Sequence, residues 1–249
     1  MNELFCPAVT LPQAYHDALR SLWHYGDRTD CPDYGTRQLE TSMTFEVIHP
    51  LQEPMISRLI PCGPRELEQY RQEVLDGILD FEAAQGNWEY TYHMRMCDQF
   101  EFIINELQRN PDSRRAVIDV RDKAADMLTD SPACLQHIQY FIRDGALHCK
   151  VLFRSNDAVK AAFMNAFALI MLQKRFADEL GVDVGSYTHR ANSFHAYEKD
   201  WPLLEAYAKV AANPGAQITY KYEGDWKELM EEEQRNIAQA VAQLEKRLL

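Results

Sequence analysis

Residues 130–157 read DSPACLQHIQYFIRDGALHCKVLFRSND, and this stretch predicts a β-hairpin. Asp144-Gly145 is a strong signal for a two-residue hairpin turn, and it separates two runs rich in β-branched and aromatic residues, HIQYFIR (137–143) and ALHCKVLFRS (146–155). The two strands of a hairpin are antiparallel, so the residues before the first strand lie beside those after the second. A single hairpin therefore joins two polar segments that are distant in sequence.

A thiol stands at one open end of this hairpin and a cationic polar cluster at the other. Cys134 follows Ser-Pro-Ala at the entrance to the first strand, and Arg154-Ser155 follows the second. A free cysteine is usually a small buried hydrophobic residue, which is how we interpret Cys149 in the second strand. The position of Cys134 allows it to face a cleft, where nearby arginines would lower its pKa and make it a nucleophile.

The remaining chain alternates irregularly between helical and extended patterns. We expect helices over 11–25, 65–80, the segment ending before Pro111, about 157–180 and 225–249, and strands over 41–48 and 114–120. Because helices and hairpins do not alternate strictly, the pattern favours an α+β fold. Without a repeat or a flexible linker, residues 1–249 are predicted to form one domain.

Composition excludes several classes of partner. The formal net charge of −12 disfavours binding to nucleic acid or to anionic membranes. A phosphate group would have to be held by a local arginine cluster. The start of the chain lacks the pattern of a signal peptide, and the six scattered cysteines are typical of free thiols in a reducing compartment. We therefore expect a cytoplasmic protein, with no metal site.

Three further motifs have both a functional and a structural interpretation. In NPDSRR (110–115), Arg114 and Arg115 point to opposite faces of a strand, so one site uses both only if the strand bends or a second subunit takes part. His195 and Tyr197 share one side of a strand, where they suit a sugar hydroxyl or a polar core equally well. Glu66 opens a helix, where a carboxylate stabilises the helix dipole.

Taken together, these segments resemble the thymidylate synthase superfamily, and most closely its pyrimidine nucleotide hydroxymethylase branch. NPDSRR (110–115), the PxC ending at Cys134, RSND (154–157) and HxY (195–197) occur in the family's order. The resemblance covers about residues 26–200. It implies a thymidylate synthase-like fold, with a central mixed sheet packed against helices and one sheet face forming a homodimer interface.

The resemblance also implies roles for individual residues at the base and the sugar. Cys134 matches the nucleophile that adds to carbon 6 of the pyrimidine, which makes carbon 5 nucleophilic. Asp157 and Asn165 match residues that contact the base, and His195 with Tyr197 matches the pair on the sugar 3′-hydroxyl. The substrate it implies is a pyrimidine nucleoside 5′-monophosphate.

The resemblance also implies which residues bind the phosphate of the nucleotide. Arg154 and Ser155 match phosphate ligands within one subunit, whereas Arg114 and Arg115 match a pair donated by the other subunit of a homodimer. Arg28 matches another phosphate ligand on a loop, although this chain departs from the pattern at DCPDYGTR and Arg37 is an alternative.

The second substrate that the resemblance implies is 5,10-methylenetetrahydrofolate. Glu66 matches a glutamate that organises water and relays protons, and Tyr92 matches a tyrosine in the same network. Leu79, with Phe81 as an alternative, stands where synthases carry a tryptophan that packs on the folate. Asp157 is expected to contact the folate as well as the base.

Two choices remain within the resemblance. Leu79 in place of tryptophan, Leu135 in place of the usual histidine after the nucleophile, and a charged C-terminal helix in place of an apolar tail favour water addition, and hence a hydroxymethyl product. Asn165 matches the N3–H and O4 of uracil and favours dUMP, but a flipped amide serves dCMP or CMP. The rivals are an ordinary thymidylate synthase and a non-catalytic nucleotide-binding relative.

Overall fold

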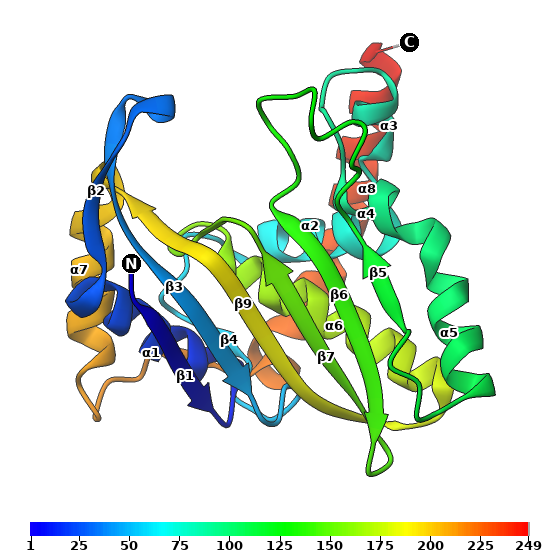
Figure 1. Cartoon of the computed structure of the whole chain (residues 1–249), viewed down its shortest axis with the longest axis horizontal. Coiled ribbons are helices and arrows are strands. Elements are labelled where there is room, and N and C mark those ends of the chain that lie inside the picture. Colours follow the sequence, from blue (N-terminus) through cyan, green and yellow to red (C-terminus); the bar gives the residue numbers. More distant parts are fainter. Residues whose placement is uncertain (249) are drawn as a thin grey trace.

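The computed structural model describes residues 1–248, which are arranged around a mixed eight-stranded sheet (Figure 1). The strand order is β1-β3-β9-β7-β6-β5, with β2 paired to β3 and β8 paired to β9. Pairs β1–β3, β7–β9 and β8–β9 are parallel, and the others are antiparallel. The strands are β1 (Glu3–Ala8), β2 (Asp27–Cys31), β3 (Thr36–Val47), β5 (Val117–Asp119), β6 (Leu135–Arg143), β7 (Ala146–Phe153), β8 (Asn156–Asp157) and β9 (Asp183–Tyr197).

The helices gather on one side of this sheet, and α2 and α6 lie behind the strands in Figure 1. A small second sheet pairs β4 (Ile56–Ser57) with β10 (Thr219–Tyr220). The helices are α1 (Leu11–Tyr25), α2 (Pro64–Asp76), α3 (Asp80–Ala84), α4 (Tyr92–Met96), α5 (Phe100–Arg109), α6 (Ala162–Leu180), α7 (Trp201–Ala211) and α8 (Lys227–Leu248). None of the helices in residues 1–248 is long and apolar enough to cross a membrane.

The predicted hairpin is confirmed as β6 and β7. Its turn residues, Asp144 and Gly145, both have positive φ, 52° and 76°, which is the backbone that an Asp-Gly hairpin turn requires. From the turn, the register runs through Ile138↔Val151 to Leu135↔Phe153, with one irregularity near Leu135. The polar segments at the open ends of the hairpin are therefore neighbours in space.

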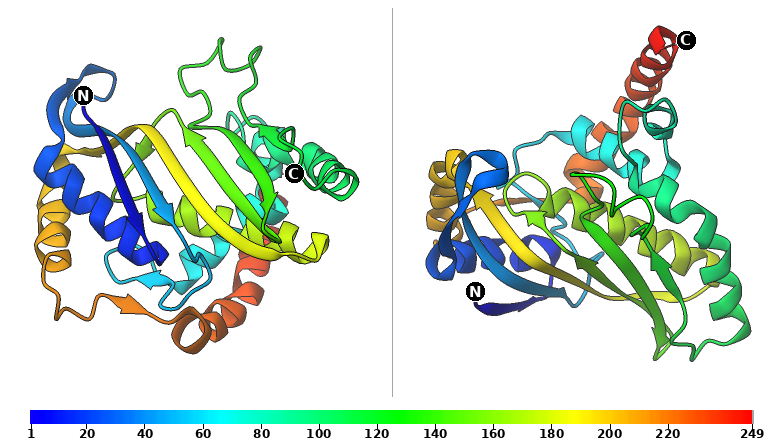
Figure 2. Two further views of the ribbon diagram at one scale, coloured as in Figure 1. Left: turned by 60° about the horizontal axis from the view of Figure 1, so that its bottom comes forward. Right: turned by 45° about the horizontal axis from the view of Figure 1, so that its top comes forward.

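Side chains alternate between the two faces of the sheet. On the helix side, residues such as Phe45, Tyr187 and Val151 are at most 3% exposed. On the opposite side, residues such as Thr44 and Arg190 are polar and at least partly exposed. Because the helices pack on one side, the polar face is uncovered within residues 1–248 (Figure 2).

Some boundaries differ from the sequence-based prediction. The central helix α6 begins at Ala162 instead of about residue 157, because Asp157 belongs to β8 and accepts hydrogen bonds from the backbone N–H groups of Val159 (3.0 Å) and Lys160 (2.9 Å). Helix α2 ends at Asp76, before Gly77 with φ 66°. Leu249, the last residue of the predicted C-terminal helix, lies outside the described residues.

One buried polar side chain ties α6 to the sheet. Gln173 is fully buried, and its Nε2 donates hydrogen bonds to the carbonyl oxygens of Leu147 on β7 (2.7 Å) and Gly185 on β9 (3.1 Å). These bonds fix the position of α6 along both strands.

We predict that Gln173→Leu lowers the free energy of unfolding by about 2 kcal/mol, because two buried carbonyl groups lose their donor. Urea denaturation measures this loss. Gln108→Leu on the exposed face of α5 is the control, with a change below about 0.5 kcal/mol. Equal effects of the two substitutions would contradict this role of Gln173.

Candidate active site

A pocket of about 520 Å³ opens where the hairpin ends meet β9, α2 and α6. Eight of the residues predicted as site residues line it: Tyr92, Cys134, Arg154, Ser155, Asp157, Asn165, His195 and Tyr197. The other lining residues are Cys31, Tyr34, Gln38, Tyr70, Asn156, Ala161 and Ser193. We call it the main pocket.

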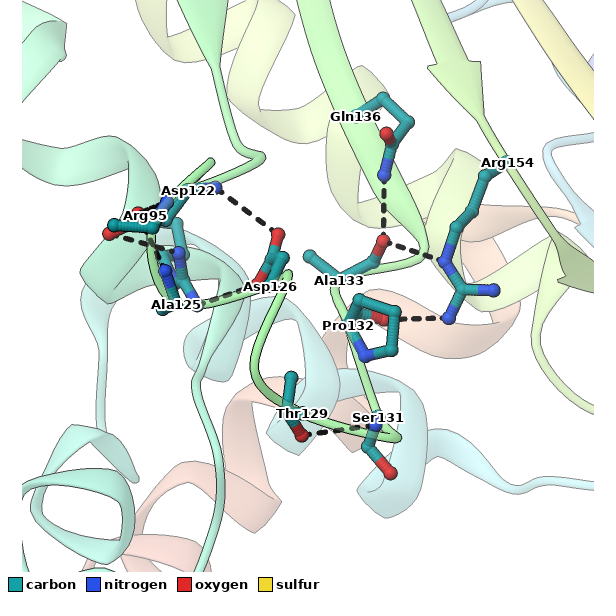
Figure 3. Close-up of polar contacts among 11 residues, drawn as sticks. Arg95, Asp122, Ala125, Asp126, Thr129, Ser131, Pro132, Ala133, Gln136 and Arg154 are labelled. Carbon is teal, nitrogen blue, oxygen red and sulfur yellow. Dashed lines mark hydrogen bonds and ion pairs between the residues drawn. The ribbon is translucent and has the colours of Figure 1, made fainter.

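Arg154 joins the two open ends of the hairpin (Figure 3). Its Nε donates to the carbonyl oxygen of Ala133 (3.1 Å), and its Nη2 donates to that of Pro132 (2.7 Å). Its backbone N–H also donates to the carbonyl oxygen of Cys134 (2.8 Å). The guanidinium group therefore stands beside Cys134, held by the chain that leads to it.

The loop before Cys134 is anchored at its other end by a buried ion pair. Nη2 of Arg95 lies 3.0 Å from Oδ1 of Asp126, and the side chain of Asp126 is inaccessible to solvent. Oδ2 of Asp126 accepts a hydrogen bond from the backbone N–H of Asp122 (3.2 Å), as Figure 3 shows. Residues 122–133 are thus fixed at both ends, which restrains the backbone of Cys134.

Two opposed effects act on the Cys134 thiol. Burial raises its pKa, because the thiolate is poorly solvated there, while the positive charge of Arg154 lowers it. Burial is the larger effect, so the resting thiol is protonated near neutral pH. A bound ligand that shields the pocket from water would strengthen the attraction between Arg154 and a thiolate.

The RSND segment reaches the pocket because β8 pairs with β9. Asn156 and Asp157 lie opposite Phe194 and His195. Behind them, Nε2 of the buried His189 lies 2.9 Å from Oδ1 of Asn156. Burial lowers the pKa of His189 to about 3, so the ring is neutral and donates this hydrogen bond.

His195 and Tyr197 point into the same pocket, as their two-residue spacing predicts. Their rings are 5.0 Å apart and nearly perpendicular. Burial lowers the pKa of His195, which leaves a neutral imidazole near the hydroxyls of Ser155 and Ser193. The ring of Tyr34, from the tip of the β2–β3 hairpin, lies 5.3 Å from that of Tyr197 at an angle of 53°, so this hairpin completes that wall.

Asn165 lies on the first turn of α6 and is 5% exposed. Its Oδ1 accepts a hydrogen bond from the hydroxyl of Tyr70 on α2. Tyr92, at the start of α4, accepts a hydrogen bond from the backbone N–H of Leu135 (3.4 Å). Two tyrosines from separate helices therefore line the pocket between Asn165 and the hairpin.

A smaller aromatic pocket of about 200 Å³ adjoins the main one and shares Tyr70 and Tyr92 with it. Its other walls are Glu73, Val74, Trp88, Tyr90 and Thr91. Burial raises the pKa of Glu73, whose carboxylate has one described hydrogen-bond partner, Nε2 of Gln69 (2.9 Å). Within residues 1–248 no cation forms an ion pair with Glu73, so no neighbouring positive charge offsets the effect of burial on its pKa.

Five predicted residues are not brought into either pocket, and the first two are Glu66 and Leu79. Glu66 is exposed, and its Oε2 accepts a hydrogen bond from the backbone N–H of Gly63 (2.9 Å), which caps α2. Leu79 is 5% exposed but lines neither pocket. Glu73 lies two helical turns after Glu66 and lines the aromatic pocket together with Trp88.

The arginines of the β2–β3 hairpin also lie outside the main pocket. The guanidinium of Arg28 is 5.6 Å from the ring of Trp23 and 5.4 Å from that of Trp201. Arg37 also lies 5.4 Å from Trp201, and its Nη1 is 3.7 Å from Glu198. The two candidate phosphate ligands therefore both stack on Trp201 in this structure.

Arg114 and Arg115 lie on the exposed loop between α5 and β5, and neither lines the main pocket of its own chain. Arg115 is held by Glu106, whose Oε1 accepts hydrogen bonds from Nε (3.0 Å) and lies 2.9 Å from Nη2. The structure does not bring this pair together with Cys134 within one subunit.

Sequence reasoning missed several lining residues: Tyr70, Glu73, Trp88, Tyr90, Tyr34, Gln38 and Cys31. Tyr70 follows the apolar periodicity of its helix and is easily taken for a core residue. A polar Glu73 three residues later on the same face was the available signal. Trp88 and Tyr90 belong to a segment of irregular pattern between two helices, where periodicity gives no guide.

Comparison with known proteins gives the family. The family profile described as thymidylate synthase matches residues 67–240, well over half of the chain. The chain belongs to the thymidylate synthase family. The fold agrees: a thermostable thymidylate synthase A from Bacillus subtilis superposes with a TM-score of 0.65 at 15% identity, over 81% of this chain and 84% of that one. The predicted thymidylate synthase-like α+β fold is confirmed.

Relatives by sequence carry two kinds of name. A protein of Methanocaldococcus jannaschii and one of Methanosarcina barkeri are both named "Putative thymidylate synthase". The first is 35% identical over 59% of this chain and 70% of its own length, and the second is 28% identical over 81% and 93%. A deoxyuridylate hydroxymethyltransferase of Pseudomonas phage M6 is 35% identical over 60% of this chain and 43% of its own length.

We predict that Arg154→Gln slows alkylation of Cys134 by iodoacetamide near pH 8 on the order of threefold, because loss of the positive charge raises the thiol pKa further. Peptide mapping by mass spectrometry separates Cys134 from the other cysteines. Arg154→Lys keeps the charge and should stay closer to the unmodified protein. Equal slowing by both substitutions would show that the charge is not the cause.

Proposed function

We propose that this protein is a one-carbon transferase that hydroxymethylates carbon 5 of a pyrimidine nucleoside 5′-monophosphate, with dUMP favoured over dCMP and CMP. The observation that carries the proposal is the convergence of a thiol, an amide, a guanidinium and a His–Tyr pair on one pocket. These are the groups needed to attack, recognise and hold a nucleotide. The family membership and the phage hydroxymethyltransferase relative support it.

In this proposal each wall of the main pocket meets one part of the nucleotide. Cys134 adds to carbon 6, and Asn165 reads the base edge, with Asp157 nearby. His195 and Tyr197 bind the sugar, while Arg154 and Ser155 bind the phosphate. Oδ1 of Asp157 already accepts two backbone hydrogen bonds, so its other oxygen is the one available to a ligand.

The aromatic pocket fits the second substrate. Trp88, Tyr90 and Tyr92 offer flat apolar surfaces beside the main pocket, which suit a fused heteroaromatic ring. We propose that methylenetetrahydrofolate, which supplies the one-carbon unit, places its ring system there. Trp88 and Tyr90 then orient the ring, and the shared tyrosines Tyr70 and Tyr92 separate it from the nucleotide.

Glu73 is proposed as the carboxylate that positions and deprotonates water. Its pKa is raised by burial and it lacks a described ion pair, so it accepts a proton more readily than an exposed carboxylate does. It lines the aromatic pocket beside Tyr70, whereas Glu66 caps a helix on the surface. Leu135 after the nucleophile also favours water over hydride as the final addition.

Thymidylate synthase activity is the second candidate. Trp88 provides an indole ring in the aromatic pocket, so the absence of tryptophan at Leu79 no longer argues against hydride transfer. The two archaeal relatives also carry a synthase name. The choice between hydroxymethylation and methylation therefore depends on whether water or hydride reaches the one-carbon group on carbon 5.

A homodimer is proposed through the uncovered face of the sheet. Thymidylate synthase-like proteins commonly dimerise, and in the described part of the chain the helices leave this face without a covering layer (Figure 1). Such an association allows Arg114 and Arg115 to reach the pocket of the other subunit. Glu106 already holds Arg115 in one orientation on the surface.

The decisive experiment offers dUMP, UMP, dCMP and CMP with methylenetetrahydrofolate and identifies the product by mass. We expect a gain of CH₂O on dUMP, and tritium release from carbon 5 that Cys134→Ser abolishes. A gain of CH₂ with formation of dihydrofolate would establish the synthase instead. Failure to react or to release tritium with any of the four would leave only a binding protein.

A second prediction concerns the carboxylate. Glu73→Gln should lower kcat about 100-fold or more, because it removes a proton acceptor. Protonation of Glu73 at low pH should reduce the rate of the unmodified enzyme, at a pH above the usual carboxyl range because its pKa is raised, and the variant should lose this limb. A larger loss in Glu66→Gln than in Glu73→Gln would return the role to Glu66.

A further inference from the structure

The recognition of the base depends on which way the amide of Asn165 faces. A carboxamide carries an acceptor and a donor on the same plane. Rotation by half a turn exchanges them, and it converts a group that matches uracil into one that matches cytosine. A site that discriminates between the two bases therefore needs something that prevents this rotation.

Tyr70 is placed to do so. It projects from α2 against the first turn of α6, and its hydroxyl donates to Oδ1 of Asn165. Both residues line the main pocket, and Asn165 is 5% exposed. The contact joins two helices that are 95 positions apart in sequence at these residues.

The Tyr70 hydroxyl carries a proton that needs an acceptor. Burial raises its pKa, and the nearby negative charge of Glu73 raises it further, so the hydroxyl keeps its proton. In the described residues its hydroxyl has one hydrogen-bond partner, Asn165. If the amide rotated, its Nδ2 group would donate to the tyrosine oxygen, and the Tyr70 proton would lose its acceptor.

We infer that Tyr70 is a positioning residue that locks the Asn165 amide in one orientation and thereby makes the site selective for one pyrimidine. The inference rests on the proposed function, in which that pyrimidine is uracil. The lock acts through one hydroxyl group that need not touch the base. Rotation would keep a hydrogen bond from Nδ2 but leave the Tyr70 O–H without an acceptor, and an unsatisfied buried donor changes an equilibrium on the order of tenfold or more.

The test is Tyr70→Phe, with kcat/KM measured separately for dUMP and dCMP. Removal of the hydroxyl frees the amide, so the ratio of the two values should fall toward one by about tenfold. A role in packing alone would change both values by the same factor and leave the ratio where it was. Tyr90→Phe removes a phenol that does not contact Asn165, and it should not change the ratio.

A double-mutant cycle sharpens the result. Asn165→Asp has no amide to rotate, so adding Tyr70→Phe to it should leave the base ratio unchanged, and the two substitutions should not be additive. Dissociation constants for dUMP and dCMP without the second substrate give an independent measure. They should show the same loss of discrimination.

Two results would overturn the inference while leaving the proposed function standing: an unaltered ratio in Tyr70→Phe, or additive effects in the cycle. Equal use of dUMP and dCMP by the unmodified enzyme would also overturn it. By contrast, absence of nucleotide-dependent tritium release in the unmodified enzyme would overturn the proposed function itself.

Discussion

The register of the β6–β7 hairpin is the constraint on which the rest of the site depends. The Asp144-Gly145 turn sets it at one end, it holds as far as the His137↔Leu152 pair, and a shift of one residue follows before the Leu135↔Phe153 pair. A slip of one residue would turn every buried side chain of a strand to the opposite face. It would also separate Cys134 from Arg154, which spans the open end of the hairpin. Because core burial opposes such a slip, it also keeps the thiol beside the guanidinium group.

The core supports the site at a second point through an aromatic sandwich. The ring of His189 stacks between Phe45 (4.5 Å, 6°) and Phe153 (4.7 Å, 15°). Its nitrogens meet Tyr187 and Asn156, both at 2.9 Å. His189 is neutral, both of its ring nitrogens have hydrogen-bond partners, and both faces of its ring are packed. It therefore holds Asn156, and with it the RSND segment, in a fixed position against the sheet. Phe153 belongs to β7, which makes this support another consequence of the hairpin register.

The sequence was sufficient to predict a site residue where a single strand or turn determines its position. Cys134 and Arg154 follow from the hairpin, and the shared side of the His–Tyr pair follows from strand periodicity. The sequence was insufficient where the rotation of a helix or an irregular segment decides. Glu66 and Glu73 differ by two turns of α2, and only the packing of α2 against α6 shows which carboxylate faces inward. Trp88 lies in a segment without periodicity, so its place beside Tyr70 required the structure.

The main pocket of one chain offers too little positive charge for the phosphate of the proposed substrate. Among the described residues lining the main pocket, Arg154 is the one cation, and two of its nitrogens already serve carbonyl groups. A nucleoside monophosphate carries close to two negative charges at neutral pH, and the protein as a whole carries −12. Under the proposed function, further guanidinium groups would come from Arg28 or Arg37 leaving Trp201, or from the exposed arginines of a second subunit. In the proposed dimer the second route would need no rearrangement of the β2–β3 hairpin, and it would give the uncovered sheet face a direct part in substrate binding.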